Sequence, residues 1–316
     1  MLWQTSPAAS ALEQLVLSWM AELVGYRPAA DALLVNGASL ATLYALAAAR
    51  DAALEPHPRE HGIAGTGVPQ LRVYASDQAH SCVERTAAAT GIGAANVVRV
   101  ASDASYRIRP DLLEDAIRRD TEAGRRPVAV VATVGTTAVG SADPLGPVAQ
   151  VCARNRVWLH VDAAYGGFWR IAPRLAGRTE DLSVGDSVVV NPQKCLYVPL
   201  EATALYCRRR GALARTFRLV PDYLPATGDA DGVDYMDLSP QLGRSFRALK
   251  IWWVMRSFGR AGYAARYDHA VALAQRLRAA AAADPDWRSP VESIYPLVVL
   301  RYEPREIVTD PGLTPA

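Results

Sequence analysis

The chain has 316 residues, half of them hydrophobic, and a formal net charge of +2. This near balance of charge gives no reason to expect a nucleic acid or an anionic membrane as partner. No stretch approaches the roughly 20 apolar residues that a membrane-spanning helix needs, so we expect a soluble protein. The four cysteines are scattered, without a C-x-x-C pair or a zinc-ligand spacing. Their pattern predicts neither a metal site nor a disulfide framework, and it favours a reducing cytoplasm.

The first predicted element is an amphipathic helix over about residues 8–25. Leu12, Leu15, Val16 and Trp19 recur at helical spacing, and polar residues interrupt them. A signal peptide would instead show a basic start and an uninterrupted apolar run.

Helical and strand-like segments then alternate along the chain. We expect helices over residues 40–53, 81–91, 110–120 and 145–155, and strands over residues 71–75, 96–100, 128–134, 157–161 and 187–190. The last three strands are apolar and rich in β-branched residues, which is typical of buried parallel strands. The alternation predicts an α/β fold with a mostly parallel sheet, and ligands of such sheets bind at the carboxyl ends of the strands.

The last third of the chain predicts a loop and a helical tail. Residues 227–234 (TGDADGVD) are rich in Gly and Asp and predict a mobile loop. Helices are expected over 243–257 and 263–283, followed by a turn and a strand over 294–302.

Four polar features lie where strands end or helices begin. Lys194 follows the strand 187–190, Asp162 follows the strand 157–161, His80 precedes a helix, and Ala38-Ser39 precede another. Each has an ordinary explanation: a solvated lysine, a turn-capping aspartate, a capping histidine and a helix N-cap.

Taken together, these features favour one chemistry. A lysine amine condenses with an aldehyde to form a Schiff base. A carboxylate at a strand end pairs with a protonated pyridine nitrogen, and an imidazole stacks on an aromatic ring. A helix N-terminus with a hydroxyl binds a phosphate. The combination predicts a site for pyridoxal 5'-phosphate (PLP).

Six segments resemble the group II PLP-dependent decarboxylases, and among them the aromatic-L-amino-acid decarboxylases. They are residues 37–50 (GASLATLYALAAAR), 74–85 (YASDQAHSCVER), 135–137 with Asp143, 158–167 (WLHVDAAYGG), 186–194 (DSVVVNPQK) and 242–250 (LGRSFRALK). The likeness extends from about residue 3 to residue 302.

The resemblance implies the type I, aminotransferase-like fold in a homodimer with active sites at the interface. It implies a large PLP-binding domain over residues 1–258 and the start of a small, incomplete C-terminal domain over residues 259–316. It also implies a role for each matching residue. Lys194 would form the Schiff base, Asp162 would hold the pyridinium, His80 would stack on the ring, Ala38, Ser39 and Asn191 would contact the phosphate, Thr137 would lie beside the cofactor, and Ala164 would pack under it.

Tyr223 bears on the reaction type. It matches the family position whose tyrosine returns a proton to the substrate carbon after carbon dioxide leaves, whereas relatives with phenylalanine there tend to be aldehyde synthases. We therefore expect decarboxylation of an L-amino acid. The overall resemblance to aromatic-L-amino-acid decarboxylases implies an aromatic substrate. Two alternatives stay open: an aldehyde synthase of the same family, and a PLP-binding protein with little or no turnover.

The chain departs from the family pattern beside the lysine and at both ends. Gln193 and Cys195 stand where relatives usually carry histidine and tryptophan. Gln193 can donate a hydrogen bond to a phosphate but adds no positive charge. Cys195 leaves room where an indole would pack, so we expect a less rigidly held lysine. Compared with relatives the chain starts late and stops early, and the pocket residues that would identify the substrate fall largely outside it.

Overall fold

A mixed sheet forms the centre of the molecule. The computed structural model describes residues 3, 5–26, 31–54, 58, 62–63, 67–219 and 233–304. Within them, seven strands form one sheet in the order β1-β7-β6-β5-β4-β2-β3. Their bounds are β1 Asp31–Val35, β2 Leu71–Ser76, β3 Val97–Val100, β4 Arg126–Thr133, β5 Trp158–Asp162, β6 Ser187–Val190 and β7 Thr203–Cys207.

The pairing of the strands confirms the predicted α/β class. The pairs β2–β3, β2–β4, β4–β5 and β5–β6 are parallel, while β7 runs antiparallel to both β6 and β1. Every residue of β5, β6 and β7 is buried. Strands covered on both faces carry continuous apolar runs, which is the pattern that the sequence shows here.

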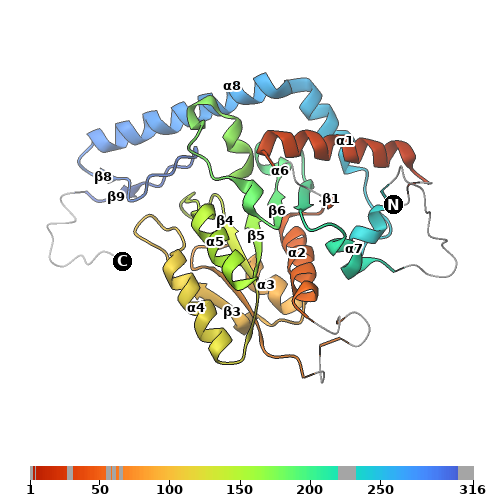
Figure 1. Ribbon diagram of the computed structural model, residues 1–316. Helices are drawn as coiled ribbons and strands as arrows, with labels where there is room; N and C mark the ends of the chain where they lie inside the picture. Colours follow the sequence, from red (N-terminus) through yellow and green to blue (C-terminus); the bar gives the residue numbers. More distant parts are fainter. Residues whose placement is uncertain are drawn as a thin grey trace.

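Helices cover both faces of the sheet. In Figure 1, α4 and α5 lie on one side of the strands and α2 on the other, with α8 running along the top above α1. The helices are α1 Pro7–Val24, α2 Ala38–Ala52, α3 Cys82–Ala89, α4 Pro110–Glu122, α5 Leu145–Asn155, α6 Pro192–Cys195, α7 Ala212–Phe217 and α8 Arg247–Ala283. Short 3₁₀ turns are η1 Ala94–Asn96, η2 Gly167–Ile171, η3 Pro173–Leu175, η4 Leu182–Val184 and η5 Tyr235–Leu238.

The C-terminal part agrees with the sequence prediction in its helices and differs from it in its last strand. Residues 243–257 and 263–283 were expected to form two helices, and α8 consists of two helices that meet at a kink, where Gly259 is non-helical (φ 60°, ψ 171°). The strand expected over 294–302 is wrong except for β9 (Arg301–Tyr302), which pairs with β8 (Trp287–Arg288). The apolar stretch ahead of β9 packs against the sheet domain instead: Tyr295 is fully buried and its ring contacts that of Tyr165.

A buried ion pair anchors the edge strand β1 just ahead of α2. The Glu13 carboxylate accepts the backbone N–H of Leu34 at 2.8 Å and the Arg244 guanidinium at 2.7 Å. Arg244 also donates to the Leu34 carbonyl, so both backbone groups of one edge residue are satisfied by side chains. The two side chains are only 1–2% exposed. This contact ties α1, β1 and the segment ahead of α8 together at the start of α2.

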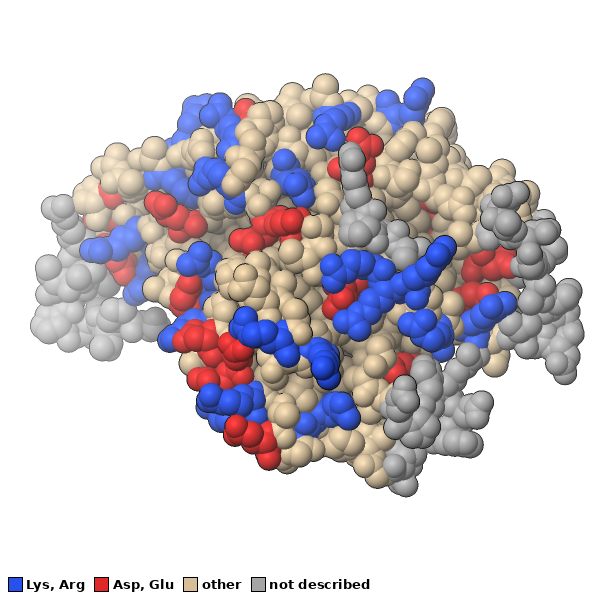
Figure 2. Space-filling model, viewed as in Figure 1, with Lys and Arg blue, Asp and Glu red and all other residues tan. Residues whose placement is uncertain are grey.

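The surface is mixed in charge. On the face shown in Figure 2, basic and acidic side chains are interspersed over much of the surface. Several form pairs, such as Arg154 with Glu114 at 2.9 Å. Among the described helices, none combines the length and the apolar character that crossing a membrane would require.

Candidate active site

A cavity of about 250 Å³ opens at the carboxyl ends of the central strands. It brings together eight of the nine residues to which the resemblance gave a role, and the ninth, Tyr223, lies outside the described residues. The cavity is lined by Gly37, Ala38, Ser39, His80, Cys82, Thr133, Gly135, Thr137, Asp162, Ala164, Tyr165, Asn191, Gln193 and Lys194. Residues that are far apart in the sequence, from Gly37 to Lys194, therefore line the same cavity.

Asp162 and Thr133 lie side by side at the floor of this cavity. Asp162 ends β5 and is paired in register with Thr133 at the end of β4. One oxygen of Asp162 accepts the backbone N–H of Ala164 at 3.1 Å, which fixes the carboxylate. The Thr133 hydroxyl is buried and has no hydrogen-bond partner among the described residues. Buried polar atoms are nearly always satisfied, so an orphan in a cavity wall fits a polar ligand that enters there.

Lys194 stands on the short helix α6 that follows β6. Its backbone N–H donates to the carbonyl of Asn191 at 3.0 Å. The Asn191 side chain accepts the Thr203 hydroxyl at 2.8 Å through its oxygen, which leaves its NH₂ group as the donor for an anion. Gln193 accepts the backbone N–H of Ala202 at 2.5 Å, so its side chain is also held by the protein.

The N-terminus of α2 supplies backbone donors at the opposite side. Gly37 precedes the helix with φ 85° and ψ 153°, a conformation that glycine adopts without strain. No side chain caps the helix and its first turn holds no acidic residue. The free N–H groups and the positive end of the helix dipole therefore face the cavity without a competing anion.

His80 makes the capping contact that was weighed for it from the sequence. Its Nδ1 accepts the backbone N–H of Cys82 at 3.1 Å, which is a capping contact at the start of α3. The same contact fixes the plane of the ring, while the residue as a whole remains exposed. A ring that is oriented but uncovered can stack on a planar group in the cavity.

Asp143 is a supporting residue whose function the sequence did not reveal. It is fully buried and accepts the backbone N–H groups of Ile108 at 2.7 Å and Thr133 at 2.8 Å. Burial raises the pKa of its carboxyl to about 6, and the two N–H groups oppose this shift. Asp143 thus holds the end of β4 next to Asp162.

The segment after Lys194 is held by aromatic residues. The Cys195 thiol donates to the Tyr165 carbonyl at 3.2 Å, and the Cys195 carbonyl accepts the Tyr267 hydroxyl at 2.6 Å. The Tyr263 hydroxyl donates to the next carbonyl, that of Leu196, at 3.0 Å. Two tyrosines of α8 therefore anchor the backbone beside the small Cys195 side chain. Tyr165 lines the cavity, and burial raises the pKa of its phenol to about 12.

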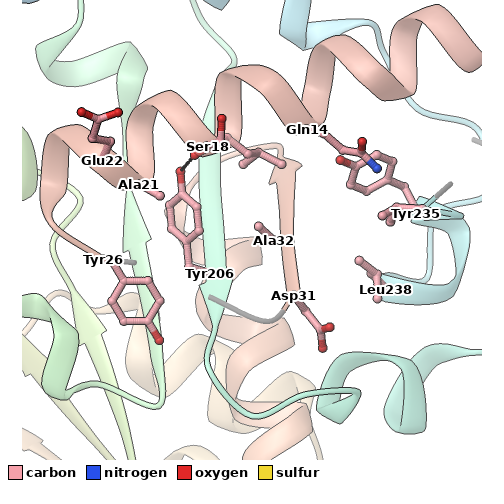
Figure 3. Close-up of a pocket in the computed structure, with 12 residues that line it drawn as sticks. Gln14, Ser18, Ala21, Glu22, Tyr26, Asp31, Ala32, Tyr206, Tyr235 and Leu238 are labelled. Atoms are coloured by element: carbon pink, nitrogen blue, oxygen red, sulfur yellow. Dashed lines mark hydrogen bonds between the residues drawn. The ribbon is translucent and has the colours of Figure 1, made fainter. Parts of the chain in front are cut away.

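A larger cavity of about 620 Å³ lies elsewhere, between α1, β1 and η5 (Figure 3). Its lining contains no lysine, histidine or cysteine among the described residues. The Tyr206 hydroxyl, which Figure 3 shows pointing toward α1, donates to the Leu17 carbonyl at 2.8 Å. The Tyr26 hydroxyl donates to the Gly185 carbonyl at 3.0 Å. These groups serve the fold, and the described lining of this cavity offers no amine for covalent chemistry.

Comparison with known proteins identifies the family of the chain. Residues 1–303 match the family model described as the pyridoxal-dependent decarboxylase conserved domain. The chain is 36% identical to histidine decarboxylase of Drosophila melanogaster over 98% of this chain and 37% of that protein. It is 35% identical to aromatic-L-amino-acid decarboxylase of Sus scrofa over 95% of this chain and 63% of that protein.

Solved structures give the same result. Oryza sativa TDC with PLP and tryptamine superposes with a TM-score of 0.89 at 34% identity, over 96% of this chain and 63% of that one. The 4-hydroxyphenylacetaldehyde synthase of Rhodiola rosea superposes with a TM-score of 0.86 at 31% identity, over 98% and 64%. The chain therefore spans less than two thirds of the length of each of these relatives.

Proposed function

The chain belongs to the pyridoxal-dependent decarboxylase family, and on this premise we propose that it holds PLP on Lys194 and removes the carboxyl group of an aromatic L-amino acid. One observation carries the proposal. A lysine, an aspartate, an orphan hydroxyl and an uncapped helix N-terminus line one cavity at the carboxyl ends of β4, β5 and β6.

The residues of the cavity fit the two ends of the cofactor. The N-terminus of α2, with Ala38 and Ser39, would bind the phosphate, together with the amide NH₂ of Asn191. Asp162 would accept the proton of the pyridine nitrogen, and the unpaired Thr133 hydroxyl beside it gains a partner from the same ring. Thr137 and Ala164 would lie beside and beneath the ring.

The remaining roles concern the reaction. When bound, PLP withdraws electrons from the α-carbon of the amino acid. Lys194 supplies the amine that holds the cofactor and exchanges with the amino group of the substrate. His80, with its ring plane fixed by the Cys82 N–H, covers one face of the cofactor. Tyr223, outside the described residues, is proposed as the acid that returns a proton to the α-carbon.

Lysine labelling tests the cofactor site directly. The chain contains two lysines, Lys194 and Lys250, so each is a control for the other. Borohydride reduction of the protein with PLP should attach the pyridoxyl group to Lys194. We expect the label in the Lys250→Arg variant and not in the Lys194→Arg variant. A label on Lys250, or none in the wild-type chain, contradicts the proposal.

A substrate panel tests the reaction. Carbon dioxide release is measured with L-Tyr, L-Trp, L-DOPA, L-His and L-Glu. The relatives include histidine, tryptophan and aromatic-amino-acid decarboxylases, so we expect release from at least one of the ring-bearing substrates and none from L-Glu. A labelled lysine without any carbon dioxide would favour a PLP-binding protein without turnover.

An aldehyde synthase is the second candidate, because the relatives include a phenylacetaldehyde synthase of Arabidopsis thaliana, 31% identical over 96% of this chain. That reaction releases hydrogen peroxide and ammonia, which coupled assays detect. With Tyr223 in its proposed role, the Tyr223→Phe variant should release more peroxide and less amine than the wild-type chain. Equal products from both proteins would remove Tyr223 from the mechanism.

We also propose a homodimer in a reducing cytoplasm. Tyr197, Leu200, Phe246 and Trp253 are exposed apolar residues on the segment after Lys194 and on α8 and its approach. Exposed apolar clusters of this kind mark interfaces. Light scattering should give a dimer for the wild-type chain, a smaller mass for Trp253→Glu, and an unchanged mass for the control Leu277→Glu. The compartment is supported by four free, buried cysteines.

A further inference from the structure

A buried hydrogen-bond chain links β5, the strand that ends at Asp162, to α2, the helix whose N-terminus lines the cavity. His160 lies on β5, two residues before Asp162, so the two side chains point to the same face of the sheet. Its imidazole is completely buried, and burial lowers its pKa to about 3. The ring is therefore neutral at physiological pH, with one nitrogen that donates and one that accepts.

Both ring nitrogens of His160 have a partner. Nδ1 lies 2.8 Å from the hydroxyl of Ser187 on β6, and that hydroxyl also accepts the indole N–H of Trp158. Nε2 lies 3.2 Å from the hydroxyl of Thr42 on α2. Either tautomer satisfies both contacts, because each hydroxyl can donate or accept. The network is complete, which makes it rigid and directional.

The contact between His160 and Thr42 links the sheet to the helix that lines the proposed phosphate site. Thr42 lies one helical turn below Ala38 on the same face of α2, directly behind the proposed phosphate site. The buried residues of α2 near it, Ala41, Tyr44, Ala45 and Leu46, all belong to the hydrophobic core. Apolar contacts are non-directional, so they specify the position of the helix less sharply than a hydrogen bond does. The bond from Nε2 to Thr42 fixes its position against β5.

We propose that His160 is a positioning residue that sets the span between the N-terminus of α2 and the carboxylate of Asp162. This inference rests on the proposed PLP site, because the span matters only for a ligand that occupies both ends. A ligand that binds at one end alone should be indifferent to His160. A ligand that bridges both ends should bind less tightly when the span is no longer fixed.

The experiment compares a bridging ligand with its two halves. Dissociation constants are measured on the full chain for PLP, for pyridoxal without phosphate and for inorganic phosphate, by absorbance for the first two and by competition for the third. For His160→Leu we expect PLP affinity to fall about 3- to 10-fold, the range of one hydrogen bond. Pyridoxal and phosphate should change by less than about twofold.

Two amide variants of His160 distinguish the proposed positioning of α2 from the mere need to give the buried hydroxyl groups a hydrogen-bond partner. Glutamine can place its amide near the position of Nε2 and keep the bond to Thr42, whereas asparagine reaches only the Nδ1 side, toward Ser187. His160→Gln should therefore retain most of the PLP affinity, and His160→Asn should resemble His160→Leu. Thr42→Val, which removes the partner hydroxyl at nearly constant volume, should match His160→Leu, and the double variant should be no worse than either single one.

Several results would overturn the inference. Equal losses for PLP, pyridoxal and phosphate would indicate general destabilisation, and rescue by asparagine instead of glutamine would assign the function to the Ser187 side. Unchanged PLP affinity in Thr42→Val would remove the span argument even if the His160 variants fail to fold. If the wild-type chain binds no PLP, the proposed function itself is refuted. If it binds PLP and the variants do not weaken this binding, only the inference about His160 is refuted.

Discussion

The Asp143 carboxyl offers a test of which electrostatic effect dominates beside the cavity. Two backbone N–H groups donate to it, which favours the charged form, while complete burial favours the neutral form. Burial has the larger effect and raises the pKa of the Asp143 carboxyl from its ordinary value of 3.8 to about 6. Between these two values the native protein keeps a proton that the unfolded chain has released. Stability from this group is therefore full below about pH 4 and falls as the pH rises to about 6.

The perturbation is Asp143→Asn, which removes the titration and keeps one acceptor oxygen. A shift of about two pKa units corresponds to about 3 kcal/mol in the free energy of unfolding. We expect the stability advantage of the wild-type chain over the variant to shrink by about this amount between pH 3.5 and pH 7.5. Urea unfolding followed by circular dichroism at several pH values measures the difference.

The control has the opposite sign. At Asp103 burial opposes ionisation slightly, but hydrogen bonds from the backbone and side chain of Arg107 hold the pKa of the carboxyl below its usual value. The advantage of the wild-type chain over Asp103→Asn should therefore grow as the pH rises. If the advantage over Asp143→Asn also grows with pH, the N–H groups outweigh burial and the reasoning about Asp143 is refuted.

Three further predictions concern the ion pair, the orphan hydroxyl and the cysteines. Glu13→Gln should lower the free energy of unfolding by about 3–5 kcal/mol, because it leaves the Arg244 guanidinium buried without a counter-charge; a change below 1 kcal/mol in urea unfolding would contradict this. Thr133→Val should leave the unliganded protein as stable or more stable and weaken PLP about 3- to 10-fold in an absorbance titration, whereas unchanged binding would exclude this hydroxyl as a ligand. All four cysteines are buried, and desolvation raises their thiol pKa values to about 12. A disulfide reagent at pH 7.5 should therefore label none of them in the native protein and all four in guanidinium. Fast labelling of the native protein would show that it opens locally.

The sequence was most informative where an apolar run is bounded by residues that interrupt secondary structure. The strand 187–190 and the helix 145–155 were predicted with their observed bounds, because Gly185, Asn191-Pro192 and Pro144 delimit them. The edge strand β1 and its partner β7 were not predicted. Each has five residues, and their pairing joins segments far apart in the chain, which no local pattern reveals. The strand expected over 294–302 failed because apolar content alone does not distinguish pairing from packing.

The same distinction applies to the site. Residues that follow strand ends, such as Asp162 and Lys194, could be expected to meet because parallel strands place their carboxyl ends at one edge. Thr133 and Cys82 also line the cavity, but a threonine at the end of a strand and a cysteine in a helix carry no chemical signature of their own. The function of Asp143 depends on two backbone donors, and these exist only once the loop is folded.

The position of α2 connects stability with the proposed cofactor site. Leu34, held by Glu13 and Arg244, is three residues ahead of Gly37, and Thr42, held by His160, is five residues beyond it. Directional contacts thus flank the proposed phosphate site on both sides, while the buried helix residue between them, Ala41, is small and apolar. Loosening either contact should therefore weaken PLP more than pyridoxal. If Glu13→Gln lowers stability but affects both ligands equally, only the contact at Thr42 controls the span.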